Sequence, residues 1–325
     1  MARAHVERAD LVVGYLYALV AALLFGMNGS VTKVLLDSGI SGTQVTQFRV
    51  LAMCIVCGLI LLVVDRKAFR ITLKQFGVMV VLGIVGVALL QATYAYAVHL
   101  LPVGVALLLE YTAVLMVALV AFFFLKEQVK ARLWIAIGLV LLGLAVVAEV
   151  WNSTLDPLGV FFALAAAVTL AFYFLVGERQ VKSTSPLAVG FWTGLVASVF
   201  WAFFSGWWNL EPALFATPIS LSGNLESVVL PFWLVLACCV IFGSFLPFLL
   251  SLIALTKMKA TALGIIASSE VLFAFVIAWL WLGQQLNLAQ VAGAAVVLAG
   301  IVLAQTARAD KVVDADLALA PTRTP

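Results

Sequence analysis

Residues 103–124 read VGVALLLEYTAVLMVALVAFFF and contain a single acidic or basic side chain, Glu110. A helix of this length, rising about 1.5 Å per residue, crosses the hydrocarbon core of a bilayer, which is about 30 Å thick. The rest of the chain has the same character. Of its 325 residues, 65% are hydrophobic and 10% are charged, whereas about 25% are charged in an average soluble domain. The sequence therefore predicts an all-α polytopic membrane protein.

Similar apolar runs recur along the chain between charged or Gly- and Pro-rich breaks. They predict ten membrane spans, at 11–32, 43–64, 76–98, 103–124, 133–150, 157–177, 187–207, 230–254, 260–281 and 288–307. The connections are short except for 208–229, which follows Trp207 and is predicted to be an interfacial loop with an aromatic anchor. Too little chain remains outside the spans for an independent soluble catalytic domain.

The basic residues test the number and direction of the spans, because cytoplasmic loops of membrane proteins are rich in Lys and Arg. When ten spans alternate, all of the 18 Lys and Arg residues except Lys33 and Arg49 fall on one side. This predicts that both termini are cytoplasmic, with residues 1–10 as an N-terminal segment and residues 308–325 as a disordered tail. Cleavage of the first span as a signal peptide would break the alternation, so we expect this span to be retained.

The two halves of the chain resemble each other. A shift of 157 residues superposes Val114 on Val271 and Gly143 on Gly300, and a shift of 145 superposes residues 14–19 on 159–164. Each half, 11–150 and 157–307, contains five predicted spans, and an odd number inserts the second half upside down relative to the first. The sequence thus predicts two inverted five-helix repeats around a central cavity, an architecture in which the substrate site lies where the halves meet.

Motifs near the end of each half resemble those of a known family. Residues 125–129, Leu-Lys-Glu-Gln-Val, with Trp134 and Gly143 after them, resemble the Leu-Gly-Glu-x-Leu ending of the EamA-type repeat in the drug/metabolite transporter superfamily. Residues 282–286, Leu-Gly-Gln-Gln-Leu, with Gly293 and Gly300 after them, resemble it again. Residues 269–271, Ser-Glu-Val, are similar to the Leu-Glu-Pro-Val of the same family.

The resemblance covers residues 11–307 and implies a ten-helix basket in a bacterial inner membrane that moves small metabolites. The chain departs from the family pattern at three positions. Gln284 replaces a glutamate, Val271 stands where proline is frequent, and Ala113 stands where the first half has proline or threonine. The family serves many substrates, so the resemblance alone does not name the substrate.

Two glutamates lie inside predicted spans and away from the span ends, where an ionisable residue costs roughly 2.5–3.5 kcal/mol on insertion scales. A ninth helix that starts near Ala260 would place Glu270 about 15 Å deep, at the membrane midplane. Glu110 lies one turn before Ala113, which is the equivalent of Glu270 under the shift of 157. We expect both acids to face the repeat interface. In a functional role they bind a substrate amine or carry a coupling proton. In a structural role they hold the fold through hydrogen bonds or an ion pair.

Further polar and aromatic side chains inside the spans either line a substrate cavity or bond one helix to another. These are Asn28, Gln91, Tyr94, Tyr111 and Tyr173. Asn28 and Tyr173 are equivalent under the shift of 145. Lys33 and Arg49 lie at predicted outer ends, where they either snorkel to the interface or form an outer gate with Glu110 or Asp37.

The sequence lacks the motifs of several other classes of protein. It has no phosphate loop, no zinc-binding set of Cys and His, and no hydrolase motif, so we expect no cofactor, no metal, no ATP and no nucleic acid. The prediction is a secondary transporter, acting as an exporter of small organic metabolites such as amino acids by alternating access. Two rivals remain, a membrane receptor or scaffold that binds without transport and a membrane enzyme with a lipid substrate. The enzyme is the weaker rival because the loop 208–229 offers only Glu211 and Glu226.

Overall fold

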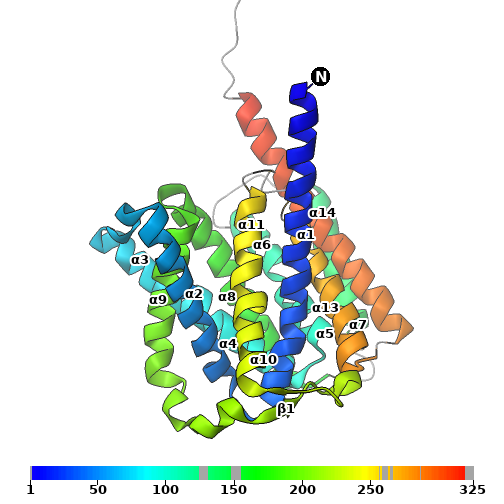
Figure 1. Ribbon diagram of the computed structural model, residues 1–325. Coiled ribbons are helices and arrows are strands. Elements are labelled where there is room, and N and C mark those ends of the chain that lie inside the picture. The colour runs from blue at the N-terminus through cyan, green and yellow to red at the C-terminus, as the bar shows by residue number, and fades with distance from the viewer. Residues whose placement is uncertain are drawn as a thin grey trace, which may run out of the picture.

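The computed structural model describes residues 2–123, 131–147, 155–255, 257, 263, 266–285 and 287–318. In these ranges the chain forms a helical bundle (Figure 1). Long apolar helices cover Val12–Asp37, Gly42–Val64, Leu73–Leu100, Pro157–Gly177, Pro186–Phe204 and Phe232–Ser251, and shorter ones cover Val103–Val117, Trp134–Val147, Ser269–Leu282 and Leu288–Leu303. Every predicted span overlaps one of these segments. The number of membrane crossings stays a prediction.

The first half contains two interrupted helices. Its elements are α1 (Ala2–Asp37), α2 (Gly42–Val64), the 3₁₀ turn η1 (Arg66–Phe69), α3 (Leu73–Gly83), the π-helix η2 (Ile84–Leu89), α4 (Leu90–Leu100), α5 (Val103–Glu110), α6 (Ala113–Phe123) and α7 (Ala131–Val147). The third predicted span is therefore α3, η2 and α4 in sequence. The fourth is α5 and α6, with a break between them.

The second half repeats both interruptions. Its helices are α8 (Pro157–Ser183), α9 (Pro186–Phe204), α10 (Phe232–Val240), the π-helix η6 (Ile241–Phe245), α11 (Leu246–Leu255), α13 (Ser269–Leu282) and α14 (Leu288–Ala318). The eighth predicted span is α10, η6 and α11. The ninth is helical at Ile266 and Ala267, turns at Ser268 and continues as α13 from Ser269, so Glu270 lies in the first turn of α13 rather than in the middle of a continuous helix.

Short polar side chains fix where several helices begin. Ser41 caps α2 and Thr72 caps α3, each in a capping box with a glutamine three residues later. Asp156 caps α8 and Ser185 caps α9, and a proline follows each of them at the first helical position. These caps satisfy backbone N–H groups that the first turn of a helix leaves without a partner. The sequence thus sets these boundaries locally.

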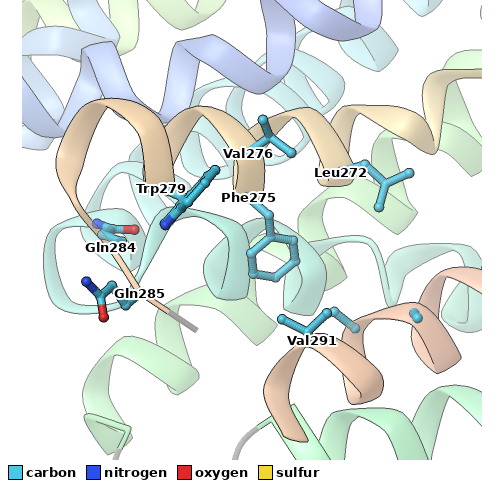
Figure 2. A pocket seen from close by; sticks show the side chains of 9 residues that line it. Leu272, Phe275, Val276, Trp279, Gln284, Gln285 and Val291 are labelled. Atoms are coloured by element: carbon cyan, nitrogen blue, oxygen red, sulfur yellow. The ribbon is translucent and has the colours of Figure 1, made fainter. Parts of the chain in front are cut away.

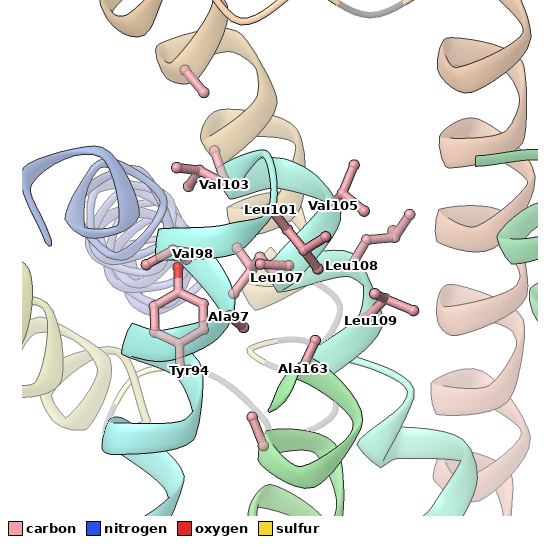
Figure 3. Close-up of a cluster of buried hydrophobic side chains, with 14 of the residues drawn as sticks. Tyr94, Ala97, Val98, Leu101, Val103, Val105, Leu107, Leu108, Leu109 and Ala163 are labelled. Atoms are coloured by element: carbon pink, nitrogen blue, oxygen red, sulfur yellow. The ribbon is translucent and has the colours of Figure 1, made fainter. Parts of the chain in front are cut away.

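Helices from opposite halves pack in pairs. The helix α1 lies against α13 and α11, α8 lies against α4, α5 and α6, α2 against α9, and α7 against α14. The largest buried cluster includes residues of the hairpin formed by α4 and α5, together with Ala163 of α8 (Figure 3). The paired helices are far apart in the chain, and the buried cluster contains residues of both, so the core belongs to both halves.

The long connection between α9 and α10 crosses the end of the bundle opposite to the start of α1 (Figure 1). It contains 3₁₀ turns at Trp207–Asn209, Pro212–Ala216 and Gly223–Leu225, and strand β1 (Pro218–Ser220) pairs antiparallel with β2 (Val229–Pro231). Gln44 donates to the carbonyl of Gly206, and the Trp281 indole donates to that of Leu221. The connection is therefore attached to the start of α2 and to the end of α13.

The C-terminal segment differs from the sequence expectation, because α14 continues to Ala318, into the region predicted as a disordered tail. Residues 2–10, predicted only as an N-terminal segment, continue α1 as helix. Residues 308–318, RADKVVDADLA, contain three alanines and neither glycine nor proline, the two residues that most disfavour helix. Residues 319–325 lie outside the described residues, as do 125–129 and most of 258–265.

Candidate functional site

The two helix breaks occur at equivalent positions of the two halves. Thr112 Oγ1 donates to the carbonyl of Leu109 at 2.7 Å, and Ser269 Oγ donates to that of Ile266 at 2.6 Å. Each donor is 157 residues from its counterpart, and so is each acceptor. Side-chain hydroxyls that bond to a backbone carbonyl compete with regular helix, because they offer the backbone another partner. The α5–α6 break and the start of α13 thus have the same local cause.

A short hydrogen bond joins the two breaks. Tyr111, in the first break, donates from its hydroxyl to Oε2 of Glu270 at 2.6 Å. Glu270 lies in the first turn of α13, where the helix dipole favours negative charge. The distance is typical of a hydroxyl that donates to an ionised carboxylate. The structure therefore brings together two of the residues that the sequence singles out, one from each half.

Glu110 lies next to this pair at the last residue of α5. Its side chain is 8% exposed, and its Oε2 has no hydrogen-bond partner among the residues that the structure describes. The charges of Glu270 and Arg49 lie close enough to act on it. Glu270, in contrast, is partly exposed. The two acids thus share one neighbourhood but differ in accessibility and in partners.

Arg49 brings the only nearby positive charge among the described residues that act on these acids. We expected its side chain at the outer end of a span, but it is 7% exposed. Its Nε donates to Oγ of Ser244 in the π-helix η6 at 2.8 Å. The side chain turns inward because its hydroxyl partner and both acids lie inside the bundle. Arg49 therefore connects α2 in the first half to η6 in the second.

Asn28 reaches the same π-helix from α1. It is buried, and its Oδ1 accepts from the thiol of Cys239 at 3.6 Å. A Cβ atom added to Gly243 would collide with the Asn28 side chain, so a glycine is needed there for the close approach. The neighbouring residues Gly243 and Ser244 of η6 thus hold Asn28 and Arg49.

Tyr173 occupies the symmetry-related position rather than the same site. It packs against Gly86 of the π-helix η2, with Val50 and Val87 nearby. Gly86 and Gly243 are 157 residues apart, as are the starts of η2 and η6. The surroundings of Tyr173 are largely apolar, whereas those of Asn28 carry Arg49. The structure therefore does not bring Asn28 and Tyr173 into one cluster.

The remaining predicted site residues fall into two groups. Tyr94 is buried in α4, with both acids and Arg49 close enough to act on it electrostatically. Gln91 lies one turn away on the same helix, and its buried Oε1 has no hydrogen-bond partner within the described ranges. Lys33 lies apart, because its Nζ donates to the carbonyls of Val98 and His99 at the end of α4. It therefore caps a helix end rather than pairing with Glu110 or Asp37.

The sequence reasoning missed the π-helices as functional elements. Gly243 and Ser244 interrupt an apolar span, and Gly83 and Gly86 do so in the first half. π-Helices are frequent at functional sites. The repeat offset, applied to these small residues, would have found both segments. No local sequence pattern indicated that Arg49 would bond to Ser244.

A separate apolar pocket of about 430 Å³ lies between α13 and α14 (Figure 2). Leu272, Phe275, Val276 and Trp279 form one wall, and Gln284 and Gln285 lie at one end. Leu272, Val276 and Trp279 are about half exposed, so this wall lies on the surface of the bundle. The mainly apolar lining of this pocket suits a hydrocarbon chain rather than a polar metabolite. The polar cluster of Glu110, Tyr111, Glu270 and Arg49, hereafter the acid cluster, is the better candidate site.

Known proteins resemble this chain over most of its length. The model of the EamA-like transporter family matches residues 12–148 and again residues 157–306. An uncharacterized transporter of Clostridium kluyveri is 24% identical over 181 residues, which cover 52% of this chain and 57% of that protein. The threonine/homoserine exporter RhtA of Escherichia coli is 26% identical over 208 residues, which cover 62% of this chain and 63% of the exporter. The matches thus span about three fifths of these relatives.

A solved structure shares the fold. It is 18% identical, covers 91% of this chain and 98% of its own, and has a TM-score of 0.58. At this identity the likeness concerns the fold alone. The family matches extend over nearly the whole chain, and the relatives are transporters rather than enzymes. The chain therefore belongs to the EamA-like transporter family.

Proposed function

We propose that this protein is a secondary transporter that exports small organic metabolites such as amino acids by alternating access, with the acid cluster as its substrate and coupling site. The observation that carries the proposal is the hydrogen bond from Tyr111 to Glu270. It joins two equivalent helix breaks from opposite halves, and buried acids at such breaks mark substrate or ion pathways in membrane proteins.

Reciprocal contacts support two inverted repeats. A Cβ on Gly143 would meet Val297 and the carbonyl of Gly293, and one on Gly300 would meet Val140 and the carbonyl of Ala136. Each of these contacts maps onto the other under the shift of 157. Reciprocity of this kind is what a two-fold axis produces. The contacts shift toward the start of α14 as they shift toward the end of α7, so the two helices are antiparallel. The two-fold axis is then perpendicular to both helices, as inversion requires.

The contacts of α1 and α8 support the same arrangement. Gly26 of α1 packs on Glu270 and Ala274 of α13. The equivalent residue of α8, Ala171, packs in a cluster with Ala113 and Val117 of α6. The family model also matches twice, once in each half. Together these observations support ten spans in the bacterial inner membrane, and the distribution of Lys and Arg supports cytoplasmic termini.

The chemistry of the acid cluster supports an amine-bearing substrate. Glu270 is a partly exposed carboxylate at a helix break, and a protonated amino group is its natural partner. The exporter of Escherichia coli that this chain resembles is named for threonine and homoserine. The aromatic rings of Tyr94 and Tyr111 beside the acids would contact the carbon skeleton of such a molecule.

Counterflow into liposomes tests the proposal. Purified protein is reconstituted in vesicles loaded with an unlabelled amino acid, and uptake of the same labelled compound is followed for a panel that includes threonine and homoserine. We expect accumulation of at least one member above protein-free vesicles, and its loss in a Glu270→Ala variant that remains folded. Saturable binding without counterflow for every member would favour a receptor and refute transport.

A further inference from the structure

Three polar side chains beside α1 are buried and have unused hydrogen-bond donors. Asn28 is 4% exposed, and Arg49 and Tyr94 are each 7% exposed. Arg49 bonds through Nε to Ser244, and Asn28 accepts at Oδ1 from Cys239. Within the described ranges, the terminal nitrogens of Arg49, Nδ2 of Asn28 and the hydroxyl of Tyr94 form no further hydrogen bond. Each of these unused groups can donate, so a ligand that meets them must bring acceptors.

Contacts of α1 and of the π-helix η6 place the three side chains close together. Asn28 lies against η6, and Ser244 of the same π-helix accepts from Arg49 Nε at 2.8 Å. A Cβ atom added to Gly29, the neighbour of Asn28, would lie 2.7 Å from the hydroxyl oxygen of Tyr94. The three donors therefore surround one short stretch of α1, although they come from three different helices.

The charge of Arg49 identifies the kind of ligand. Its guanidinium forms no ion pair with any carboxylate in the described part of the chain, and Ser244 brings no charge to it. A buried cation without a counter-ion is costly, so the position calls for an anion. A carboxylate fits best, because its two oxygens accept parallel bonds from the planar guanidinium fork.

From this geometry we propose, building on the proposed transport function, that Arg49, Asn28 and Tyr94 bind the carboxylate of the substrate. The substrate class is then a zwitterionic amino acid, whose ammonium group is left for Glu270. The charges balance without any proton transfer. A zwitterion has no net charge, and it brings one negative charge to Arg49 and one positive charge to Glu270.

The helix α1 also brings this donor set close to Glu270. A Cβ atom added to Gly26 would lie 2.7 Å from the carbonyl oxygen of Glu270. Gly29, which contacts Tyr94, is three residues later, about 4.5 Å along the helix axis. The two charged ends of the proposed site thus meet α1 within one helical turn. Such a separation suits an α-amino acid, in which a single carbon atom joins the ammonium and carboxylate groups.

The other π-helix indicates that Arg49 is not needed merely to pack such an element. Tyr173 packs against Gly86 of η2, and the Trp201 indole donates to the carbonyl of Ala88 at 3.2 Å. Aromatic side chains thus pack the equivalent π-helix. The cation beside η6 belongs to one half alone, as expected of a group that serves a ligand rather than the repeated fold.

A comparison of threonine with threoninamide tests the proposal. Threoninamide keeps the ammonium group and replaces the carboxylate by a neutral amide of similar shape. Binding of each compound to detergent-solubilised protein is measured by calorimetry at a mildly acidic pH, at which both amino groups are protonated. Wild type should bind threonine at least about tenfold more tightly, because the amide loses the charge-assisted bonds to the guanidinium. If another amino acid of the counterflow panel binds instead, that compound and its amide take their place.

The variants are compared by the ratio of the two affinities, which does not depend on how much of each protein is folded. Arg49→Gln should bring the ratio close to one. Arg49→Lys should lower it, because an ammonium group keeps the charge but lacks the planar fork. Tyr94→Phe and Asn28→Ala should lower it by smaller factors. Arg66→Gln, which removes an exposed guanidinium just after α2, should keep the wild-type ratio.

Equal affinity for both compounds in wild type, or a wild-type ratio in Arg49→Gln, would overturn the proposal. If Arg49→Gln does not fold, an unchanged ratio in Arg49→Lys would overturn it instead. If no amino acid of the panel binds, both the carboxylate site and the proposed function fail. A preference for threonine without counterflow would refute transport and leave the carboxylate site standing. Counterflow that accepts threonine and threoninamide equally would do the reverse.

Discussion

The hydrogen bond between Tyr111 and Glu270 can be measured with a double-mutant cycle. Tyr111→Phe removes the donor, Glu270→Ala removes the acceptor, and the double variant removes both. Each protein is unfolded reversibly with a denaturing detergent in mixed micelles. The coupling energy is the destabilisation of the double variant minus the sum of the destabilisations of the two single variants.

The structure gives the expected size of this coupling. The two oxygens are 2.6 Å apart, as expected for an ionised acceptor. Hydrogen bonds to charged groups contribute about 1.5–3 kcal/mol, whereas interhelical hydrogen bonds in a membrane protein average about 0.6 kcal/mol. Because this bond is only partly buried, we expect about 1.5 kcal/mol, close to a tenfold change in an equilibrium constant.

A second cycle provides the control. Tyr96 stacks on Phe162, at 5.1 Å between ring centroids. In the described part of the chain it forms no hydrogen bond with the acid cluster, so Tyr96→Phe and Glu270→Ala should be additive within about 0.5 kcal/mol. A coupling between Tyr111 and Glu270 below about 0.5 kcal/mol would refute an ionised Glu270 held by Tyr111. It would leave the two helix breaks energetically independent.

Three further predictions concern packing, topology and the π-helix. Gly243→Ala should destabilise the fold by about 1–3 kcal/mol because its Cβ would collide with Asn28, whereas Gly77→Ala, with open space around it, should be neutral or stabilising in the same thermal unfolding assay. Cysteines introduced at Lys74 and at Glu226, both exposed, should react with an impermeant reagent from opposite faces of oriented vesicles, and labelling from one face would contradict the alternation of spans. Asn28→Ala should alter the ranking of transported amino acids with protein abundance unchanged, and an unchanged ranking would assign Asn28 to packing alone.

The sequence was sufficient for the features that depend on local composition. Hydropathy marks where helices can cross a membrane, because each such segment must satisfy its own backbone in lipid. Caps such as Ser41 and Asp156 fix helix starts through atoms only a few residues away. The acids Glu110 and Glu270 stand out for the same reason, since an ionisable group within an apolar run is costly wherever it lies.

The offset between the halves also had predictive value beyond the identities that revealed it. The equivalent hydroxyl bonds of Thr112 and Ser269 and the equivalent π-helices follow the shift of 157. Asn28 and Tyr173, equivalent under the shift of 145, nevertheless lie in different surroundings, Asn28 beside Gly243 and Tyr173 beside Gly86. A two-fold relation places equivalent residues at symmetry-related positions, and these need not form one site.

What the sequence by itself determined is therefore the class of protein, the approximate helical segments and the two acids, because hydropathy and capping act over a few neighbouring residues. Tertiary structure alone decided which groups meet. Arg49 and Ser244 are separated by 195 positions in the chain, and Tyr111 and Glu270 by 159. No pattern along the chain records such pairings, since they arise only when helices of opposite halves pack together. Within the described part of the chain, that packing leaves Oε2 of Glu110 without a hydrogen-bond partner and gives Glu270 a hydroxyl donor.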